Sequence, residues 1–509
     1  MTTSPPPELP PARKSSLFAN PEGGTYVVPF VLVTSLFLLW GFCNGMIDVM
    51  DKHFQEELHL TLAQSAWVQF AHYLGYFLMA LPAGWIASKI GYKGGIIAGL
   101  LMVAAGGFWF IPATHISSFW AFLLGVCTIA AGLTFLETVA NPYTTVLGPK
   151  EFAATRINLA QSCNGIGWIF GPLAGTAFFY STDSAGRSTG AQTLWIPYAG
   201  VGVVVLILAV VFFKARIPDI KTSDDYHLDD QPAGSKGAVN LNICPRWVAM
   251  LVLWLNLAVL ATAIGMIASA IASINSMNEA LGLKVLLVTA GTLLAIGTLF
   301  LLVKPGAVTY RSIWTHPHFS SATIAQFFYV AAQSGIFAYF INYLTSEAPV
   351  KITNQTASTL ASLGFFCFLA GRFSGAGLLK KFAPHKVLGI YALVNVLMCG
   401  VIMMKLGWIS VVALFLSYFF MSVMFPTIFA LGIFGLGARA KKASAFIVMA
   451  IMGGAIMPKL MGHVADVHGM SQGFIVPLAC FLVVAAYGFS WSKLSGAERL
   501  AAPSLAGKH

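Results

Sequence analysis

Long apolar runs, separated by short stretches rich in glycine, proline or charge, recur along the whole chain. A run of about 20 apolar residues has the length of an α-helix that crosses the hydrocarbon core of a bilayer. Fourteen runs meet this description, near residues 26–50, 62–89, 94–113, 117–147, 153–180, 194–213, 247–273, 281–303, 318–345, 355–379, 384–405, 409–436, 442–464 and 473–493. The pattern therefore predicts an all-α membrane protein with about 14 transmembrane helices.

The composition agrees with this prediction. Of the 509 residues, 57% are hydrophobic and 9% are charged, whereas charged residues make up about a quarter of a typical soluble domain. When the predicted helices are threaded with the N-terminus inside, 23 of the 29 Lys and Arg residues fall on the inner side. This positive-inside bias places both termini in the cytoplasm, and it explains the basic surplus without nucleic acid as a partner.

Neither the cysteines nor the N-terminal segment suggests a further function. The seven cysteines contain no CxxC pair and lie mostly in apolar runs, so we expect no disulfide, no metal site and no cofactor. The segment "TTSPPPELPPARKSS" predicts a disordered cytosolic tail. The apolar run after it is too long for a signal-peptide core, so we expect a retained first span of a multi-pass protein in a bacterial inner membrane.

Three pairs of short motifs recur at nearly constant spacing. They are "GWIASKIGYK" with "GLLKKFAPHK", "PYTTVLG" with "PTIFALG", and "GPLAG" with "MPKLMG", separated by 293, 284 and 286 residues. Each spacing exceeds half the chain length, as expected for two six-helix halves with extra residues between them. The extra residues include a predicted two-helix hairpin.

These repeats predict the following domains. We expect a disordered cytosolic tail at 1–25, an N-terminal six-helix bundle at 26–213, a cytosolic linker at 214–246, an inserted two-helix hairpin at 247–303, a cytosolic connector at 304–317, a C-terminal six-helix bundle at 318–493 and a cytosolic tail at 494–509. The hairpin has no charged residue between Trp247 and Met277, which favours a lipid-packed accessory over a part of a transport pathway.

Only two of the 18 acidic residues, Asp48 and Glu137, fall inside predicted spans. Glu137 lies ten residues before Leu147, the expected inner end of its helix, which corresponds to a depth of about 15 Å. Asp48 lies later in its own helix and nearer the outer side. A charge at the bilayer centre costs roughly 2.5–3.5 kcal/mol, so each carboxyl is a functional candidate, unless it pairs with a polar neighbour to hold helices together.

Proton coupling with sugar binding is the function that suits these carboxyls. Burial favours the neutral form of a carboxyl group, which therefore gains or loses a proton as a cavity opens to either side. The ionised form accepts hydrogen bonds from two adjacent hydroxyls, as a sugar presents them. His72 is a candidate proton relay, although a packed, hydrogen-bonded histidine is the alternative.

Uncharged polar residues accompany the carboxyls at helical spacing. Asn44 lies one turn before Asp48, and Asn141 lies one turn after Glu137. Further polar positions on predicted helices are Gln161, Asn164, Gln326, Tyr329 and Gln333. Amides and tyrosines suit a neutral, polyhydroxylated ligand, whereas an anionic ligand requires an inward Arg or Lys. Interhelical hydrogen bonds are the alternative role for each amide. Arg156 and Arg372, near inner helix ends, are interpreted as anchors or gates.

Six stretches carry a resemblance to a known family. "FLETVANPYTTVLGP", "RINLAQSCNGIG", "AQFFYVAAQ", "GRFSGAGLLKKFAPHKVL", "FMSVMFPTIFALGI" and "SAFIVMAIMGGAIM" resemble the fucose–galactose–glucose:proton symporter family of the major facilitator superfamily. The resemblance covers both halves and implies a major facilitator fold with alternating access. It also implies that Asp48 serves proton coupling, that Glu137 couples sugar recognition to protonation, and that Gln161 and Asn164 line the sugar cavity.

The sequence departs from the family pattern at a few positions, which leaves the particular sugar open. Gly45 stands where a second asparagine is expected beside Asn44, and Met424 and Phe425 replace hydrogen-bonding residues before a proline. We predict a monomeric importer of a neutral hexose, deoxyhexose or N-acetylhexosamine that uses a proton. The alternatives are sodium coupling, a proton-coupled exporter on the same fold and, less favoured, an intramembrane enzyme.

Overall fold

Helices make up nearly all of the computed structural model. It describes residues 17–19, 24–57, 67–116, 119–149, 152–179, 193, 195–218, 246–276, 279–303, 313–352, 354–436 and 439–495. Within these ranges the β-structure is a single isolated bridge between Ala19 and Thr25. This agrees with the predicted all-α class.

The first group of helices runs from the N-terminal side to residue 214. It comprises α1 (Val27–Glu57), α3 (Trp67–Ile116), α4 (Phe119–Val146), α5 (Ala153–Phe179) and α7 (Trp195–Lys214). The long α3 contains a break at Gly91, where φ is 78°. Because glycine adopts positive φ without a steric penalty, the chain turns there. Helix α3 contains the run predicted at 94–113 and residues 67–89 of the run predicted at 62–89, whose first residues lie outside the described ranges.

The second group of helices begins at residue 313 and contains several bends. Its elements are η4 (Ile313–Thr315), α10 (Pro317–Ala338), α11 (Phe340–Glu347), α12 (Asn354–Leu378), α13 (Pro384–Met403), α14 (Trp408–Met421), α15 (Met424–Ile433), α16 (Ala440–Met449), η6 (Ala450–Met452), α17 (Gly453–His468), α18 (Met470–Gly473) and α19 (Ile475–Ser495). The axes of α10 and α11 differ by 48°. A second break, at Ser422 and Val423, separates α14 from α15 inside one apolar run.

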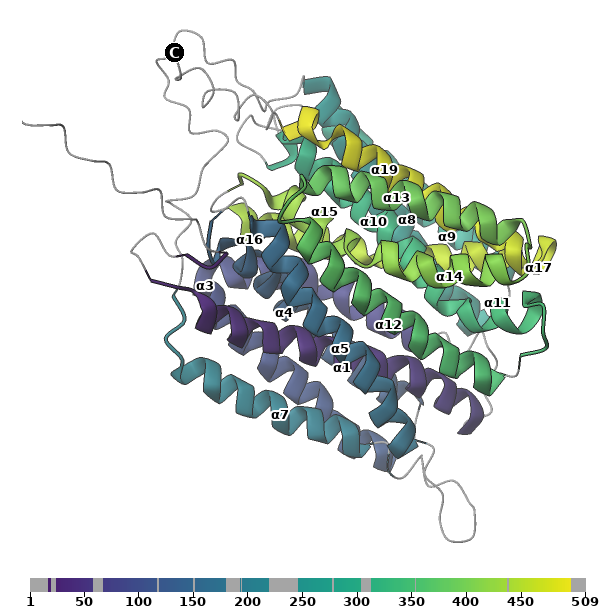
Figure 1. The fold of residues 1–509 in the computed structure, drawn as a ribbon, viewed down its shortest axis with the longest axis horizontal. Helices are drawn as coiled ribbons and strands as arrows, with labels where there is room; N and C mark the ends of the chain where they lie inside the picture. The colour runs from purple at the N-terminus through teal and green to yellow at the C-terminus, as the bar shows by residue number, and fades with distance from the viewer. Residues whose placement is uncertain are drawn as a thin grey trace, which may run out of the picture.

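The two groups repeat the same packing. In the first group α1 packs on α5 and α3 packs on α7, while in the second α10 packs on α17 and α13 packs on α19. The groups lie side by side, with the purple-to-blue helices forming one layer and the green-to-yellow helices the other (Figure 1). They meet along a seam where α5 contacts α12 and α3 contacts α16. We call these groups the N half and the C half.

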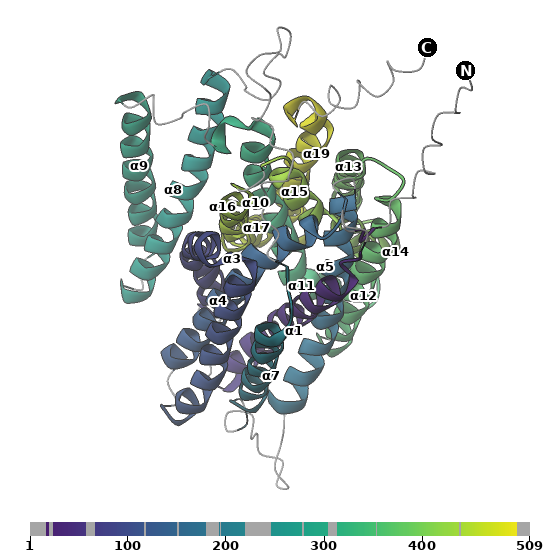
Figure 2. The same ribbon diagram turned by 90° about the vertical axis from the view of Figure 1, so that its left-hand side faces the viewer.

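Two further helices, α8 (Arg246–Ser276) and α9 (Glu279–Val303), form a hairpin between the halves in sequence. Figure 2 shows this hairpin standing to one side of the other helices. Helix α8 packs against α10, and α9 packs against α8. Most of the Lys284–Val303 segment is exposed, as expected for a helix surrounded by lipid.

The helices are long and apolar enough to place the chain in a membrane. Ten helices in the described ranges meet the length and hydropathy requirements for a span, or eleven if the bent pair α10–α11 counts as one. Large apolar side chains such as Leu287, Phe300 and Leu397 are exposed on their outer surfaces. The prediction of a multi-pass membrane protein is therefore confirmed.

Candidate functional site

Glu137 is buried in α4, nine residues before the helix ends at Val146. Only 1% of its surface is exposed, and neither carboxyl oxygen has a hydrogen-bond partner among the described residues. Most buried polar atoms in proteins are hydrogen-bonded, so an unpaired carboxyl at this depth requires a functional explanation. The position is about 14 Å along the helix from its end, in agreement with the predicted depth.

Two amides continue the polar group around Glu137. Asn141 follows one turn later on α4, and the Nε2 atom of Gln161 on α5 donates to its Oδ1 atom at 3.2 Å. The other amide atoms, Nδ2 of Asn141 and Oε1 of Gln161, are buried and unpaired in the described structure. One acidic, one donating and one accepting group thus lie together, which is the set of partners that sugar hydroxyls need.

An aromatic cluster from α1 and α3 borders this group. The indole Nε1 of Trp40 donates to the hydroxyl of Tyr76 at 2.6 Å, and the rings of Tyr76 and His72 are 5.0 Å apart. Tyr76 lies within electrostatic range of Glu137 and beside Asn44. The contacts therefore bring Asn44 and His72 to the same region as Glu137, and their roles in transport stay predictions.

The proline of "PYTTVLG" explains a polar contact between the halves. Pro142 has no N–H, so the carbonyl of Thr138, four residues earlier, loses its partner within α4. The hydroxyl of Ser444 on α16 donates to this carbonyl at 2.9 Å. The carbonyl freed by a proline in one half thus receives a hydrogen bond from a side chain of the other half.

The matching motif "PTIFALG" has the same effect in the C half. Pro426 cannot donate to the carbonyl of Ser422, where α14 ends, and the Nε atom of Arg372 on α12 donates to it at 3.1 Å. The Nη1 atom of Arg372 reaches across the seam to two residues of α5: it donates to the backbone oxygen of Gln161 and, at 3.0 Å, to Oδ1 of Asn164. The Nδ2 atom of Asn164 donates to the carbonyl of Phe37 on α1 at 3.3 Å.

Sequence reasoning did not include Arg372 among the binding residues, because it placed this residue near an inner helix end as an anchor or gate. The structure buries it to 3% exposure against two predicted sugar-binding residues. The available signal was Pro426, since a carbonyl freed inside a membrane span needs a donor.

Three predicted residues of the C half lie on α10. Tyr329 donates to the carbonyl of Met421 at 3.0 Å, and its ring is 6.3 Å from that of Phe425. The ring of Phe425 is in turn 6.1 Å from that of Trp40. Phe425 therefore lies between Tyr329 and the aromatic cluster that borders Glu137. Gln326 is buried with both amide atoms unpaired in the described ranges, and Gln333 is half-buried. The contacts described here do not tie either glutamine to Glu137.

The remaining predicted residue, Asp48, belongs to α1, but the structure does not describe its side chain. His72 is buried, and its Nδ1 atom has no partner among them. Its role as a relay therefore stays a prediction.

Two side-chain hydrogen bonds connect the halves on either side of this region. Toward the α4–α5 connection, the amide of Asn158 donates to the hydroxyl of Thr427 at 3.1 Å. Toward the opposite end, the hydroxyls of Tyr73 and Ser334 are 2.7 Å apart. Side-chain hydrogen bonds therefore join the two halves near both of these helix ends.

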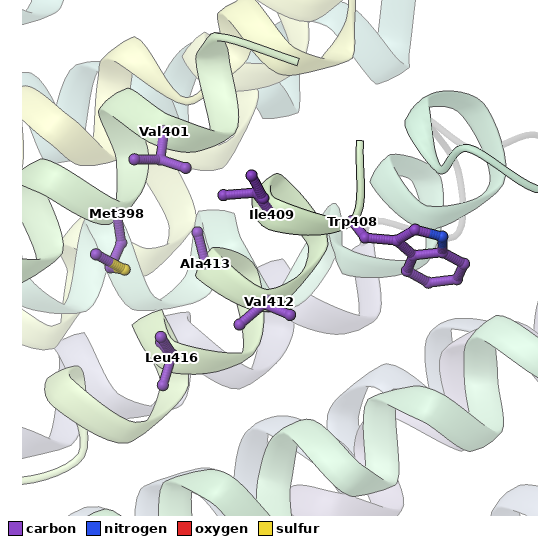
Figure 3. Close-up of a pocket in the computed structure, with 7 residues that line it drawn as sticks. All are labelled: Met398, Val401, Trp408, Ile409, Val412, Ala413 and Leu416. Carbon is purple, nitrogen blue, oxygen red and sulfur yellow. The ribbon is translucent and has the colours of Figure 1, made fainter. Parts of the chain in front are cut away.

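A separate groove lies on the outer surface between α13 and α14. Its volume is about 350 Å³, and Met398, Trp408 and Leu416 are among its apolar lining residues (Figure 3). It is distant in the fold from the Glu137 group and presents almost no polar surface. We therefore place the candidate site at the seam, where the unpaired polar atoms are, and interpret the groove as lipid-facing.

Comparison with known proteins defines the class to which this arrangement belongs. Residues 26–315 match the model of the Major Facilitator Superfamily. The chain is 32% identical over 480 residues to the L-fucose-proton symporter of Escherichia coli, with 91% of this chain and 93% of that protein covered. It is 26% identical over 462 residues to the glucose/galactose transporter of Brucella abortus, with the same two coverages.

Solved structures agree. An outward-facing structure of the Major Facilitator Superfamily transporter FucP has a TM-score of 0.67 and 31% identity, with 92% of this chain and 99% of that chain covered. A proton:xylose symporter, XylE, shares the fold with a TM-score of 0.59 and 14% identity, with 92% of this chain and 95% of that chain covered. The chain is therefore a member of the Major Facilitator Superfamily, and within it belongs to the fucose–galactose–glucose:proton symporter family.

Proposed function

We propose that the protein imports a neutral sugar together with a proton by alternating access. The observation that carries this proposal is the unpaired carboxyl of Glu137, which lies with the amides of Asn141 and Gln161 close to the seam between two halves. The relatives that transport L-fucose, glucose or galactose support a hexose or deoxyhexose as the substrate.

The proposed transport cycle depends on the protonation state of Glu137. With the seam closed, the neutral form of Glu137 avoids the cost of an unpaired buried charge. When the seam opens to one side, water and sugar hydroxyls reach the carboxyl and stabilise its ionised form. In this proposal the sugar is bound by Asn44, Glu137, Asn141, Gln161, Asn164, Gln326, Tyr329 and Gln333. Asp48 is a second proton-coupling group, and His72 is a relay.

The proposal includes a topology with 14 spans. Helix α3 contributes two of them because its apolar stretch of 47 residues is interrupted at Gly91. Helices α5 and α8 do not meet the length and hydropathy requirements above, but we count them as two further spans. The total is then six spans in each of the regions 26–213 and 318–493 and two in the hairpin 247–303. The connections at 214–246 and 304–317 and the tails at 1–25 and 494–509 then lie in the cytoplasm of a bacterial cell. We expect a monomer.

Transport by purified protein in proteoliposomes tests the function. We expect L-fucose, D-glucose or D-galactose to accumulate when the outside is acidic, because an inward proton gradient drives symport. Accumulation that needs a sodium gradient instead would replace the proton with sodium. Sugar loss driven by the same acidic outside would identify an exporter. Chemical alteration of a sugar or lipid by the protein in detergent would favour the enzyme alternative.

A further inference from the structure

We propose that Arg372 binds the sugar from the C half and determines which hydroxyl pattern the site accepts. This inference rests on the proposed sugar transport and deepens it, because it adds a cationic hydrogen-bond donor to the uncharged residues described above. The substrate class remains a neutral sugar, with the guanidinium donating to its hydroxyl oxygens.

The burial of Arg372 is not explained by capping the Ser422 carbonyl. A hydroxyl is sufficient for that task, since Ser444 caps the equivalent carbonyl of Thr138. Removing a guanidinium from water costs several kcal/mol unless an anion or a full set of acceptors compensates it. Within the described ranges no carboxylate forms a salt bridge with Arg372. A cation at this position therefore serves a partner other than the helix break.

The hydrogen bonds of Arg372 leave part of the guanidinium free for a ligand. The three bonds use Nε and Nη1, and the face of the group lies over the ring of Phe368, with Cζ 4.5 Å from the ring centroid. A guanidinium has five N–H groups, and none of these bonds uses the pair on Nη2. Two parallel N–H donors match two adjacent oxygens, as on a vicinal diol.

The bond to Asn164 indicates how a sugar enters. The Oδ1 atom of Asn164 accepts from Nη1 of Arg372 across the seam, and it is one of the acceptors predicted for the sugar. A sugar hydroxyl that donates to this oxygen takes the place of Nη1. The released N–H then donates to a neighbouring sugar oxygen, so the number of hydrogen bonds is maintained while a direct contact between the halves is replaced by one through the ligand.

Affinities of deoxy-sugars for wild type and Arg372→Gln test this assignment. The sugars are L-fucose, D-galactose and D-glucose, each with its mono-deoxy analogues, and binding is followed by tryptophan fluorescence. Ser374→Ala is the matched control, because Ser374 is exposed on the same helix and donates to the carbonyl of Gly371. We expect Arg372→Gln to weaken binding of the parent sugar about tenfold, which corresponds to about 1.4 kcal/mol. The control is expected to bind like wild type.

The decisive readout is non-additivity. For each hydroxyl that Arg372 contacts, the analogue lacking it shows a smaller difference in affinity between wild type and Arg372→Gln, while the other analogues retain the tenfold difference. A purely structural arginine weakens every analogue by the same factor, and that result would overturn the proposal. Arg372→Lys keeps the charge but not the planar fork and is measured in parallel with thermal stability. Failure of both variants to fold would make Arg372 a structural residue. If wild type binds none of the sugars, the proposed function itself fails.

Discussion

Arg156 and Arg372 are both buried, but Arg156 bonds within the N half whereas Arg372 connects the two halves. Arg156 on α5 is fully buried and donates to the carbonyls of Thr144 at 3.0 Å and Pro149 at 2.7 Å, as well as to those of Thr145, Gly148 and Leu17. All of these acceptors are backbone atoms at one end of the N half. Arg372 is bonded to both halves, and one of its acceptors is a side chain.

The difference separates a structural role from one in transport. When the halves move relative to each other, every bond of Arg156 travels with the N half and stays intact. The bonds of Arg372 to α5 have to break or be replaced, because its own helix belongs to the C half. A buried charge that is satisfied within one rigid body stabilises that body, whereas a buried charge satisfied across two bodies contributes to the equilibrium between their arrangements.

Replacement of Glu137 is expected to have the largest effect. Glu137→Gln keeps the shape of the side chain but cannot release a proton, so proton-driven accumulation of sugar should fall to the level of vesicles without protein. Uptake of radiolabelled sugar under an imposed pH gradient measures this, and counterflow reports whether sugar binding survives. Glu347→Gln is a matched control, since Glu347 forms its ion pair with Lys405 at 3.1 Å at the end of α11. Normal accumulation of sugar by Glu137→Gln would contradict proton coupling by Glu137 and would leave its carboxyl with a structural role.

Replacement of Asp48 addresses the second carboxyl. Asp48→Asn should abolish accumulation driven by a pH gradient but leave sugar exchange between equal concentrations intact, because the Glu137 site itself is unchanged. The ratio of accumulation to exchange in the same vesicles gives the result. Unchanged accumulation would contradict proton coupling by Asp48 and leave Glu137 as the sole candidate among the intramembrane carboxyls.

Replacement of Arg156 tests the structural side of the comparison. Arg156→Gln removes several hydrogen bonds to buried backbone carbonyls, at a cost of about 3 kcal/mol of stability. The melting temperature in detergent should fall, while the relative affinities for different sugars stay the same. Lys214→Gln, at the exposed end of α7, is the control for loss of a positive charge. A changed sugar preference in Arg156→Gln would remove the distinction between the two arginines.

The helices were predictable because a membrane span is recorded directly in the sequence as a long apolar run. The depth of Glu137 followed from its distance to the end of its helix. Helix bends were not predictable in this way: the run at 318–345 contains the 48° bend between α10 and α11, and hydropathy does not report backbone direction. Arg372 was missed for a related reason, since its distance from the helix end does not specify the neighbours that it meets across the seam.

The smallest effect is expected at the hairpin. The amide of Asn256 on α8 donates to the carbonyl of Ser320 at 3.3 Å and accepts from the hydroxyl of Thr323, so it fixes the hairpin to α10. Nearby, Val259 of α8 and Phe77 of α3 pack against the same apolar cluster of the C half, which consists of Phe327, Met452 and Ile456. The hairpin is therefore attached to the C half and lies close to the seam.

Asn256→Leu should lower stability by only about 1 kcal/mol, because an interhelical hydrogen bond in a membrane is weak and the single hydroxyl hydrogen of Thr323 can donate to the carbonyl of Ser320 instead. Thermal unfolding in detergent gives the stability, and sugar uptake gives the function, with Thr262→Val as control because Thr262 bonds only within α8 in the described contacts. Uptake equal to that of wild type supports an accessory hairpin. A large loss of uptake with little loss of stability would instead make the hairpin, like Arg372, a part of the moving seam.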